Sequence, residues 1–223
     1  MRKYLNWGAL LLASGAASVA VPAQAAVNLV VNGSFELGID PAGQTQLVDG
    51  DITSLTGWRV LAVGVNYADS SAWDAADGTR SVELNGQGQL GGIVQRVFGF
   101  NPGRTYRLRY DVSANPFDPN PRPKASRVIA SISGGNVDIF TYTLNDINTA
   151  GNMLYTTVSY DFVAGNTFRD VQFRSLTTGT YGPVIDAVSI TIVPEASTWA
   201  MMIAGFALVG AASRRRSRGA VSA

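Results

Sequence analysis

Short runs in which apolar and polar residues alternate recur along most of the chain, and this period of two predicts β-strands. The clearest run is residues 106–112, where the apolar positions Tyr106, Leu108, Tyr110 and Val112 alternate with Arg107, Arg109 and Asp111. One face of such a strand is buried and the other meets water. The other runs that predict strands are residues 27–31, 58–63, 80–84, 91–98, 127–132, 137–143, 154–162, 168–174 and 184–192.

The segments between these runs carry turn chemistry. Asn101-Pro102-Gly103 is typical of a tight turn, and residues 115–123 hold too many prolines for a central strand. Residues 39–56 and 66–77 are predicted to be loops. About ten short strands with regular turns and no helical period predict an all-β fold, an antiparallel β-sandwich.

Both ends of the chain depart from this pattern. At the start, Arg2 and Lys3 precede a small apolar stretch, residues 9–20, and Ala23-Gln24-Ala25 forms an A-x-A site. This order is typical of a secretory signal peptide that signal peptidase cuts before Ala26. The alternative is an N-terminal membrane anchor, which the short apolar stretch and the small-residue site disfavour.

At the other end, Pro194-Glu195 precedes an uncharged apolar run, residues 199–212, and a basic cluster that comprises Arg214, Arg215, Arg216 and Arg218. The run is shorter than the roughly 20 residues that a spanning helix needs. Arginines directly after it would be held at the cytoplasmic face. A cleavable tail that the membrane holds transiently through a short helix fits this geometry better than the alternative, an ordinary tail anchor.

This tail resembles a PEP-CTERM sorting signal, in the variant with a Trp-Ala pair, here Trp199-Ala200; Ala196 stands where the tripeptide has its second proline. The resemblance implies that an exosortase, a membrane protease-transpeptidase, removes the tail. Together, the two ends and the strand pattern predict a signal peptide (1–25), a sandwich domain (26–193), a sorting signal (194–218) and a tail (219–223). The expected destination is the envelope surface or extracellular matrix of a Gram-negative-type bacterium, reached by export through the inner membrane.

Composition narrows the function of the body, residues 26–193. The chain has no cysteine, so an exported domain must rest on its core without disulfides. It has no histidine either, which excludes Ser-His-Asp and Cys-His catalysis and imidazole-based zinc sites. The body carries a net charge of −4, which does not indicate a protein that binds nucleic acid. We therefore expect a protein that is not an enzyme.

Six motifs in the body resemble the choice-of-anchor C family and, more distantly, plant cell-wall domains of the galactose-binding jelly-roll type. They are N-L-V-V-N-G-S-F-E (28–36), G-W (57–58), D-G-T-R-S-V-E-L-N-G (77–86), P-G-R-T-Y-R-L-R-Y (102–110), S-A-N (113–115) and G-P-V-I-D-A-V-S-I (182–190). The resemblance implies a jelly roll that binds polysaccharide or matrix, without established chemistry.

Asp186 is the most informative acid, because it shares the parity of Val184, Val188 and Ile190 in the last predicted strand. If that face is the inner one, a carboxylate is buried, and a buried charge needs a partner. Related carbohydrate-binding jelly rolls imply a structural calcium ion between Glu36 and Asp186, with Asp77 as a third contributor. The alternative is that Asp186 accepts backbone N–H bonds or pairs with an arginine such as Arg80.

A second candidate group is the loop aromatics Tyr67 and Trp73, with Asp69 and Asp74 beside them. An aromatic ring can stack on a sugar while carboxylates bind its hydroxyls; the alternative is that both rings cap the sandwich. The leading interpretation is an exported, non-catalytic protein that binds polysaccharide. The rivals are a purely structural, self-associating surface protein and a histidine-free glycan hydrolase or lyase.

Overall fold

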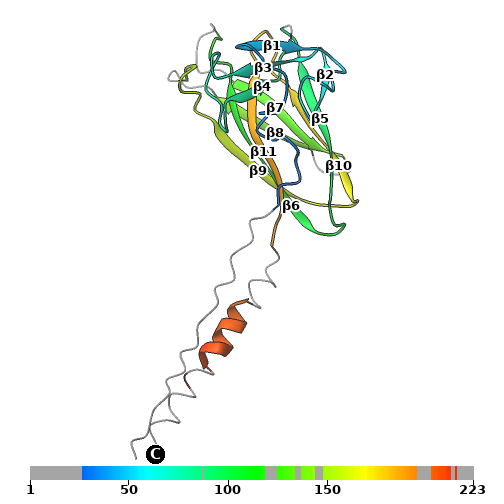
Figure 1. Cartoon of the computed structure of the whole chain (residues 1–223), viewed down its shortest axis with the longest axis vertical. Helices are drawn as coiled ribbons and strands as arrows, with labels where there is room; N and C mark the ends of the chain where they lie inside the picture. Colours follow the sequence, from blue (N-terminus) through cyan, green and yellow to red (C-terminus); the bar gives the residue numbers. More distant parts are fainter. Residues whose placement is uncertain are drawn as a thin grey trace, which may run out of the picture.

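The computed structural model is an antiparallel β-sandwich, as the sequence predicts (Figure 1), and it describes residues 27–86, 88–118, 125–133, 137–143, 148–194, 202–211 and 214. One sheet has six strands in the order β1 (Gln44–Leu47), β3 (Val65–Asp69), β4 (Arg80–Glu83), β11 (Pro183–Ile192), β6 (Thr105–Ala114) and β9 (Thr156–Val163). The other has five, in the order β2 (Arg59–Ala62), β5 (Gly91–Phe98), β10 (Phe168–Ser175), β7 (Ala125–Ile132) and β8 (Val137–Thr143).

The main core lies between the two sheets and is rich in aromatic rings. In β6 the apolar positions of the alternating run are buried and the arginines are exposed, as the pattern predicts. The Tyr110 ring of β6 meets Phe173 of β10 edge-on at 5.0 Å, and Trp58 lies 6.1 Å from the same phenylalanine. Trp58 is only 2% exposed, so it belongs to the core.

The first predicted strand, residues 27–31, is not a strand. Its backbone instead follows β11 through mixed contacts: the Leu29 N–H donates to the Ile190 carbonyl, and the Asn28 side chain accepts from the Ile190 N–H, each at 2.9 Å. The buried Gln95 side chain accepts from the Val31 N–H and donates to the Val31 carbonyl. Side-chain amides replace part of the backbone ladder here, which a hydrophobic pattern does not reveal.

Two strands, β1 and β3, fall where loops were predicted. The sequence of β1, Q-T-Q-L, is mostly polar because β1 lies at the edge of the six-stranded sheet. Strand β3 reads V-N-Y-A-D, without clean alternation, because it is covered on both sides. Tyr67 faces the main core while Ala68 faces a second apolar cluster.

That second cluster covers part of the outer face of the six-stranded sheet, and we call it the outer cluster. Its buried members are Ala68, Trp73, Met153 and Val184. The segments around Trp73 and Met153 contribute to it from outside the sheet, and a hydrogen bond from the Asp74 N–H to the Ala150 carbonyl joins them. The expected ligand loop is therefore part of the folded interior.

A β-bulge in β11 divides the strand, so the side chains before and after it do not share one face as the sequence pattern predicts. The register with β6 shifts between Asp186 and Ser189, and Ala187 has a positive φ of 51°. Val188 belongs to the main core, while Val184, two residues before Asp186, belongs to the outer cluster. Asp186 is buried, as expected, but it lies on the outer side of the six-stranded sheet and does not share a face with Val188.

Residues 202–211 are helical and exposed, in agreement with the short helix that was predicted within residues 199–212. Among the residues that the structure describes, no helix is long and apolar enough to cross a membrane. Pro194 is exposed, and Arg214 is helical. The other residues of the predicted processing sites lie outside the described ranges: Ala23, Ala25, Glu195, Ala196, Trp199, Arg215 and Arg216.

Candidate functional site: a polar groove on the five-stranded sheet

The two aromatic residues of the predicted ligand site are buried. Tyr67 is 0% exposed, and its hydroxyl donates to the Phe35 carbonyl and accepts from the Arg80 guanidinium. Trp73 is 1% exposed, and its indole N–H donates to the Ser81 hydroxyl at 2.8 Å. Neither ring offers a face to a sugar, so the contacts fit the alternative in which both rings complete the interior.

The two acids beside them serve the local fold. The Asp69 carboxylate accepts from the Ser71 hydroxyl, from the Gly43 N–H and from the Ser71 N–H. These bonds lower the pKa of Asp69, and the bond from the Ser71 hydroxyl has the largest effect. Asp74 is exposed, and its backbone carbonyl accepts from the Tyr155 hydroxyl. The structure thus places the four residues in neighbouring segments without forming an open ligand site from them.

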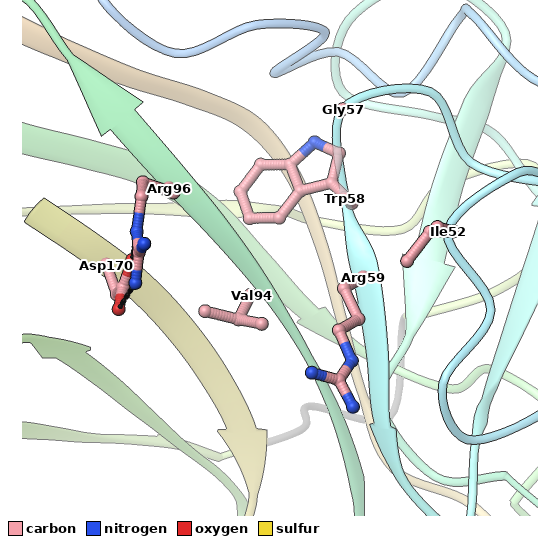
Figure 2. A pocket seen from close by; sticks show the side chains of 7 residues that line it. All are labelled: Ile52, Gly57, Trp58, Arg59, Val94, Arg96 and Asp170. Atoms are coloured by element: carbon pink, nitrogen blue, oxygen red, sulfur yellow. Dashed lines mark hydrogen bonds and ion pairs between the residues drawn. The ribbon is translucent and has the colours of Figure 1, made fainter.

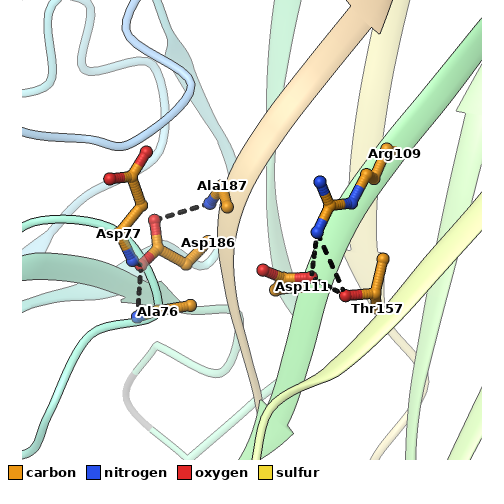
Figure 3. Close-up of polar contacts among 7 residues, drawn as sticks. All are labelled: Ala76, Asp77, Arg109, Asp111, Thr157, Asp186 and Ala187. Atoms are coloured by element: carbon orange, nitrogen blue, oxygen red, sulfur yellow. Dashed lines mark hydrogen bonds and ion pairs between the residues drawn. The ribbon is translucent and has the colours of Figure 1, made fainter.

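The predicted calcium ligands hold a loop by hydrogen bonds. One Asp186 oxygen accepts from the Ala76 and Asp77 N–H groups at 2.7 and 2.9 Å, and the other accepts from the Ala187 N–H (Figure 3). The Glu36 carboxylate accepts from the Thr79 and Arg80 N–H groups at 2.7 and 2.8 Å. Two carboxylates therefore hold residues 76–80 from opposite ends.

These hydrogen bonds give both carboxylates partners without a calcium ion. Glu36 and Asp186 accept from N–H groups of residues 76–80 and of Ala187. The described residues contain no group of three or more His, Cys, Asp or Glu side chains placed to hold a metal. The contacts favour the alternative, in which Asp186 accepts backbone N–H bonds.

Calcium is accordingly expected to leave the melting temperature unchanged when the full-length chain is heated with calcium and with a chelator. Asp186→Ala serves as the control for any effect of the ion. A calcium-dependent rise in melting temperature that Asp186→Ala abolishes would restore the calcium hypothesis.

Asp186 also faces an acid across the sheet, since its register partner in β6 is Asp111. A glycosidase needs two carboxylates open to a cleft. Asp186 is 0% exposed, and Asp111 accepts from the Thr157 hydroxyl and lies 3.9 Å from the Arg109 guanidinium (Figure 3). Burial raises the pKa of Asp186 to about 7. The same burial keeps this acid away from a substrate.

An open groove lies elsewhere, on the outer face of the five-stranded sheet. Its volume is about 380 Å³, and its lining residues are Ile52, Gly57, Trp58, Arg59, Val94, Arg96 and Asp170 (Figure 2). Figure 2 shows Arg96 and Asp170 together on one side, Arg59 and Ile52 on the other, and Val94 between them. Because Trp58 is almost wholly buried, only its edge borders the groove.

Arg96 is held in place by three contacts. Its Nε and Nη2 groups donate to the two Asp170 oxygens at 2.7 and 3.0 Å, a two-point ion pair that raises the pKa of Arg96 and lowers that of Asp170. Its guanidinium carbon also lies 5.1 Å from the centre of the Phe168 ring. Phe168 pairs with Phe98 at 6.1 Å, and these rings are 40% and 64% exposed. An exposed aromatic pair therefore lies beside the groove, next to the ion pair of β5 and β10.

The sequence pattern does not single out the groove residues. The strands that carry Arg96, Phe98 and Asp170 were predicted, and their alternation already places these side chains away from the core. What was missing is the pairing: only the register of β5 with β10 brings Arg96 opposite Asp170 and Phe98 opposite Phe168.

Comparisons with solved structures gave several carbohydrate-binding modules. A family 61 module in complex with β-1,4-galactotriose has 14% identity and a TM-score of 0.46, over 75% of this chain and 99% of the module. A family 16 module has 19% identity and a TM-score of 0.43, over 74% and 99%. The xylan-binding CBM22-1 domain of Paenibacillus barcinonensis Xyn10C has 17% identity and a TM-score of 0.42, over 78% and 99%.

Among curated proteins, halomucin of Haloquadratum walsbyi is 29% identical over 186 residues, which cover 81% of this chain. The match spans only 2% of the length of halomucin.

Two family models match the chain. The model for the PEP-CTERM protein-sorting motif matches residues 193–216, on the features that suggested such a signal. The model described as a protein of unknown function, DUF642, matches residues 28–191, on the motifs that suggested the choice-of-anchor C family. The body is thus assigned to DUF642, and the chain belongs to that family, with a PEP-CTERM protein-sorting motif after the family domain.

Proposed function

We propose that this chain is an exported, non-catalytic surface or matrix protein whose β-sandwich binds polysaccharide. The observation that carries the proposal is the order of its parts: a sorting motif at residues 193–216 directly follows an all-β domain with an open polar groove. In this proposal signal peptidase removes residues 1–25, the apolar tail holds the chain transiently in the inner membrane, and an exosortase-like protease then releases it.

The groove supports polysaccharide as the ligand because it combines two kinds of surface. Ile52 and Val94 supply apolar area for the C–H face of a sugar. Arg59, Arg96 and Asp170 supply charged donors and acceptors for hydroxyl or acidic substituents. Its open form suits a long chain that passes through, and the net charge of −4 argues against nucleic acid as the partner.

Export and processing can be tested in a bacterium with a PEP-CTERM exosortase system. The wild-type chain is expected at the surface or in the medium, without its tail. Replacing Arg214, Arg215 and Arg216 with alanine is expected to leave a longer, membrane-bound precursor, because only Arg218 remains of the basic cluster that fixes the tail's orientation.

The matched control replaces the same three arginines with lysine, which keeps the charge. Unprocessed wild-type chain in the cytoplasm would contradict the proposal. A correctly processed chain that assembles with rising concentration but binds no polysaccharide would favour the structural alternative.

A further inference from the structure

The outer face of the five-stranded sheet differs in charge from the rest of the domain. Among its described side chains the charged residues are Arg59, Arg96, Arg127, Arg174 and Asp170. The described side chains of this face include four of the eleven basic residues between positions 26 and 193 and one of the fifteen acids. A surface with net positive charge on a domain of charge −4 is a site where an anionic polymer is attracted locally.

The arginines nearest the groove are spaced along one line. Arg59 lies opposite Val94 in the register of β2 with β5, and Arg96 is two positions further along the same face. Diagonal neighbours of this kind are about 7–8 Å apart. The two arginines start from neighbouring positions and lie on either side of Val94, so each can bind a separate acidic group on one extended ligand.

Asp170 orients the Arg96 guanidinium and leaves some of its N–H donors open to a ligand. Guanidinium has five N–H donors, and the pair with Asp170 uses one on Nε and one on Nη2. The remaining donors stay available to a ligand, and the Arg96 side chain is 58% exposed despite the ion pair. Asp170 is thus a positioning residue that fixes the plane of the Arg96 fork.

The aromatic pair extends the same track. Phe98 follows Arg96 by two positions on β5, and Phe168 precedes Asp170 by two on β10, so both rings lie on the outer face beyond the ion pair. An apolar ring that is exposed to water is unfavourable in free energy, and a pair of such rings next to fixed charges is typical of a binding surface. A sugar ring can pack on them while its acidic neighbours meet the arginines.

We infer that the ligand of this face is an anionic polysaccharide, with Arg59 and Arg96 binding its acidic groups and Phe98 and Phe168 supporting a sugar ring. The inference rests on the proposed function and names its ligand class. Carboxylate and sulfate groups share the two-point geometry that arginine recognises, so both are candidates for the acidic substituent.

The test is binding of the purified full-length chain to four polymers: alginate (a polyuronate), dextran sulfate, neutral dextran and double-stranded DNA. Alginate or dextran sulfate is expected to bind, more weakly as salt rises, while dextran and DNA bind at least tenfold more weakly. Comparison of the first two polymers shows which acidic group is preferred.

The variants locate the site. Arg59→Gln/Arg96→Gln is expected to weaken binding roughly tenfold or more, because two charge-assisted contacts are lost. Arg107→Gln is the matched control: Arg107 forms the same two-point pair with Asp161, at 2.7 and 2.9 Å, with a similar exposure of 52%, but on the other sheet. It should leave binding unchanged, and all variants should melt like the wild type.

Each outcome decides between the proposals. Equal loss in both variants, or equally tight binding of DNA, would mean unspecific attraction of polyanions and would overturn the inference. Binding of neutral dextran that ignores the arginines would overturn it while the proposed function stands. No binding to any of the polysaccharides would overturn both.

Discussion

Between pH 5 and pH 7 the free energy of unfolding of this chain is expected to fall by roughly 2 kcal/mol, because the unfolded state releases a proton that the folded state keeps. Burial raises the pKa of Asp186 from 3.8 to about 7, against the opposing effect of its three N–H bonds. An unfolded aspartic acid is ionised throughout this window. Each unit of pH therefore favours the unfolded state until Asp186 itself ionises.

Few other groups of this chain titrate between pH 5 and pH 7. The chain has no histidine, the one side chain that ordinarily titrates there. The acids whose pKa is lowered, such as Asp51 (to about 2) and Asp170, act in the opposite sense but at lower pH, where their protonation destabilises the fold. Burial also raises the pKa of Glu83, which adds to the fall. We therefore expect the highest stability at mildly acidic pH.

Urea unfolding at a series of pH values measures the slope. Asp186→Asn cannot ionise, so its profile should lose most of the fall between pH 5 and 7. Asp161→Asn is the control, since Asp161 is an exposed acid whose pKa is lowered by its pair with Arg107, and its profile should keep the fall. A wild-type profile that is flat or rises in this window would show that the N–H bonds outweigh burial.

The bulge in β11 shows where prediction from the sequence stops. The pattern of residues 184–192 gives a strand, and it gives a buried acid in that strand correctly. It does not show that Ala187 takes a positive φ, a conformation that only glycine adopts at little cost. That one residue changes the side of the sheet on which Asp186 lies, and with it the partners of its carboxylate.

The groove shows the same limit at longer range. Alternation predicts which residues of β5 and β10 face outward, because that property is local. Which outward residues meet depends on strand order and register, here between positions 74 residues apart in the pair of Arg96 with Asp170. The fold class was accessible from one sequence, while the site required the pairing of strands.

Trp73→Ala is expected to lower the free energy of unfolding by roughly 4 kcal/mol, the usual cost of removing a buried tryptophan. The ring fills the outer cluster with Met153 and Val184, lies 6.0 Å from the Phe117 ring, and donates to Ser81. Its removal leaves a cavity over the six-stranded sheet and takes the indole donor away from the Ser81 hydroxyl. Thermal and urea unfolding of the full-length chain measure the loss.

Two variants separate the contributions. Trp73→Phe keeps most of the ring and should cost about 1–2 kcal/mol, mainly through the lost hydrogen bond to the Ser81 hydroxyl. Phe98→Ala removes a ring that is 64% exposed, so it should change stability by about 0.5 kcal/mol or less. A Trp73→Ala variant as stable as Phe98→Ala would mean that the outer cluster is not packed as described.

The same pair of variants decides between the two uses of aromatic residues that the sequence left open. If Trp73 stacked on sugar, Trp73→Ala would lose polysaccharide binding and keep its stability. The structure predicts the reverse below the melting temperature: Trp73→Ala loses stability but keeps binding, because the groove lies on the other sheet, while Phe98→Ala weakens binding at little cost in stability. Burial therefore assigns Trp73 to the fold, and the exposed Phe98 belongs to the ligand site that we infer.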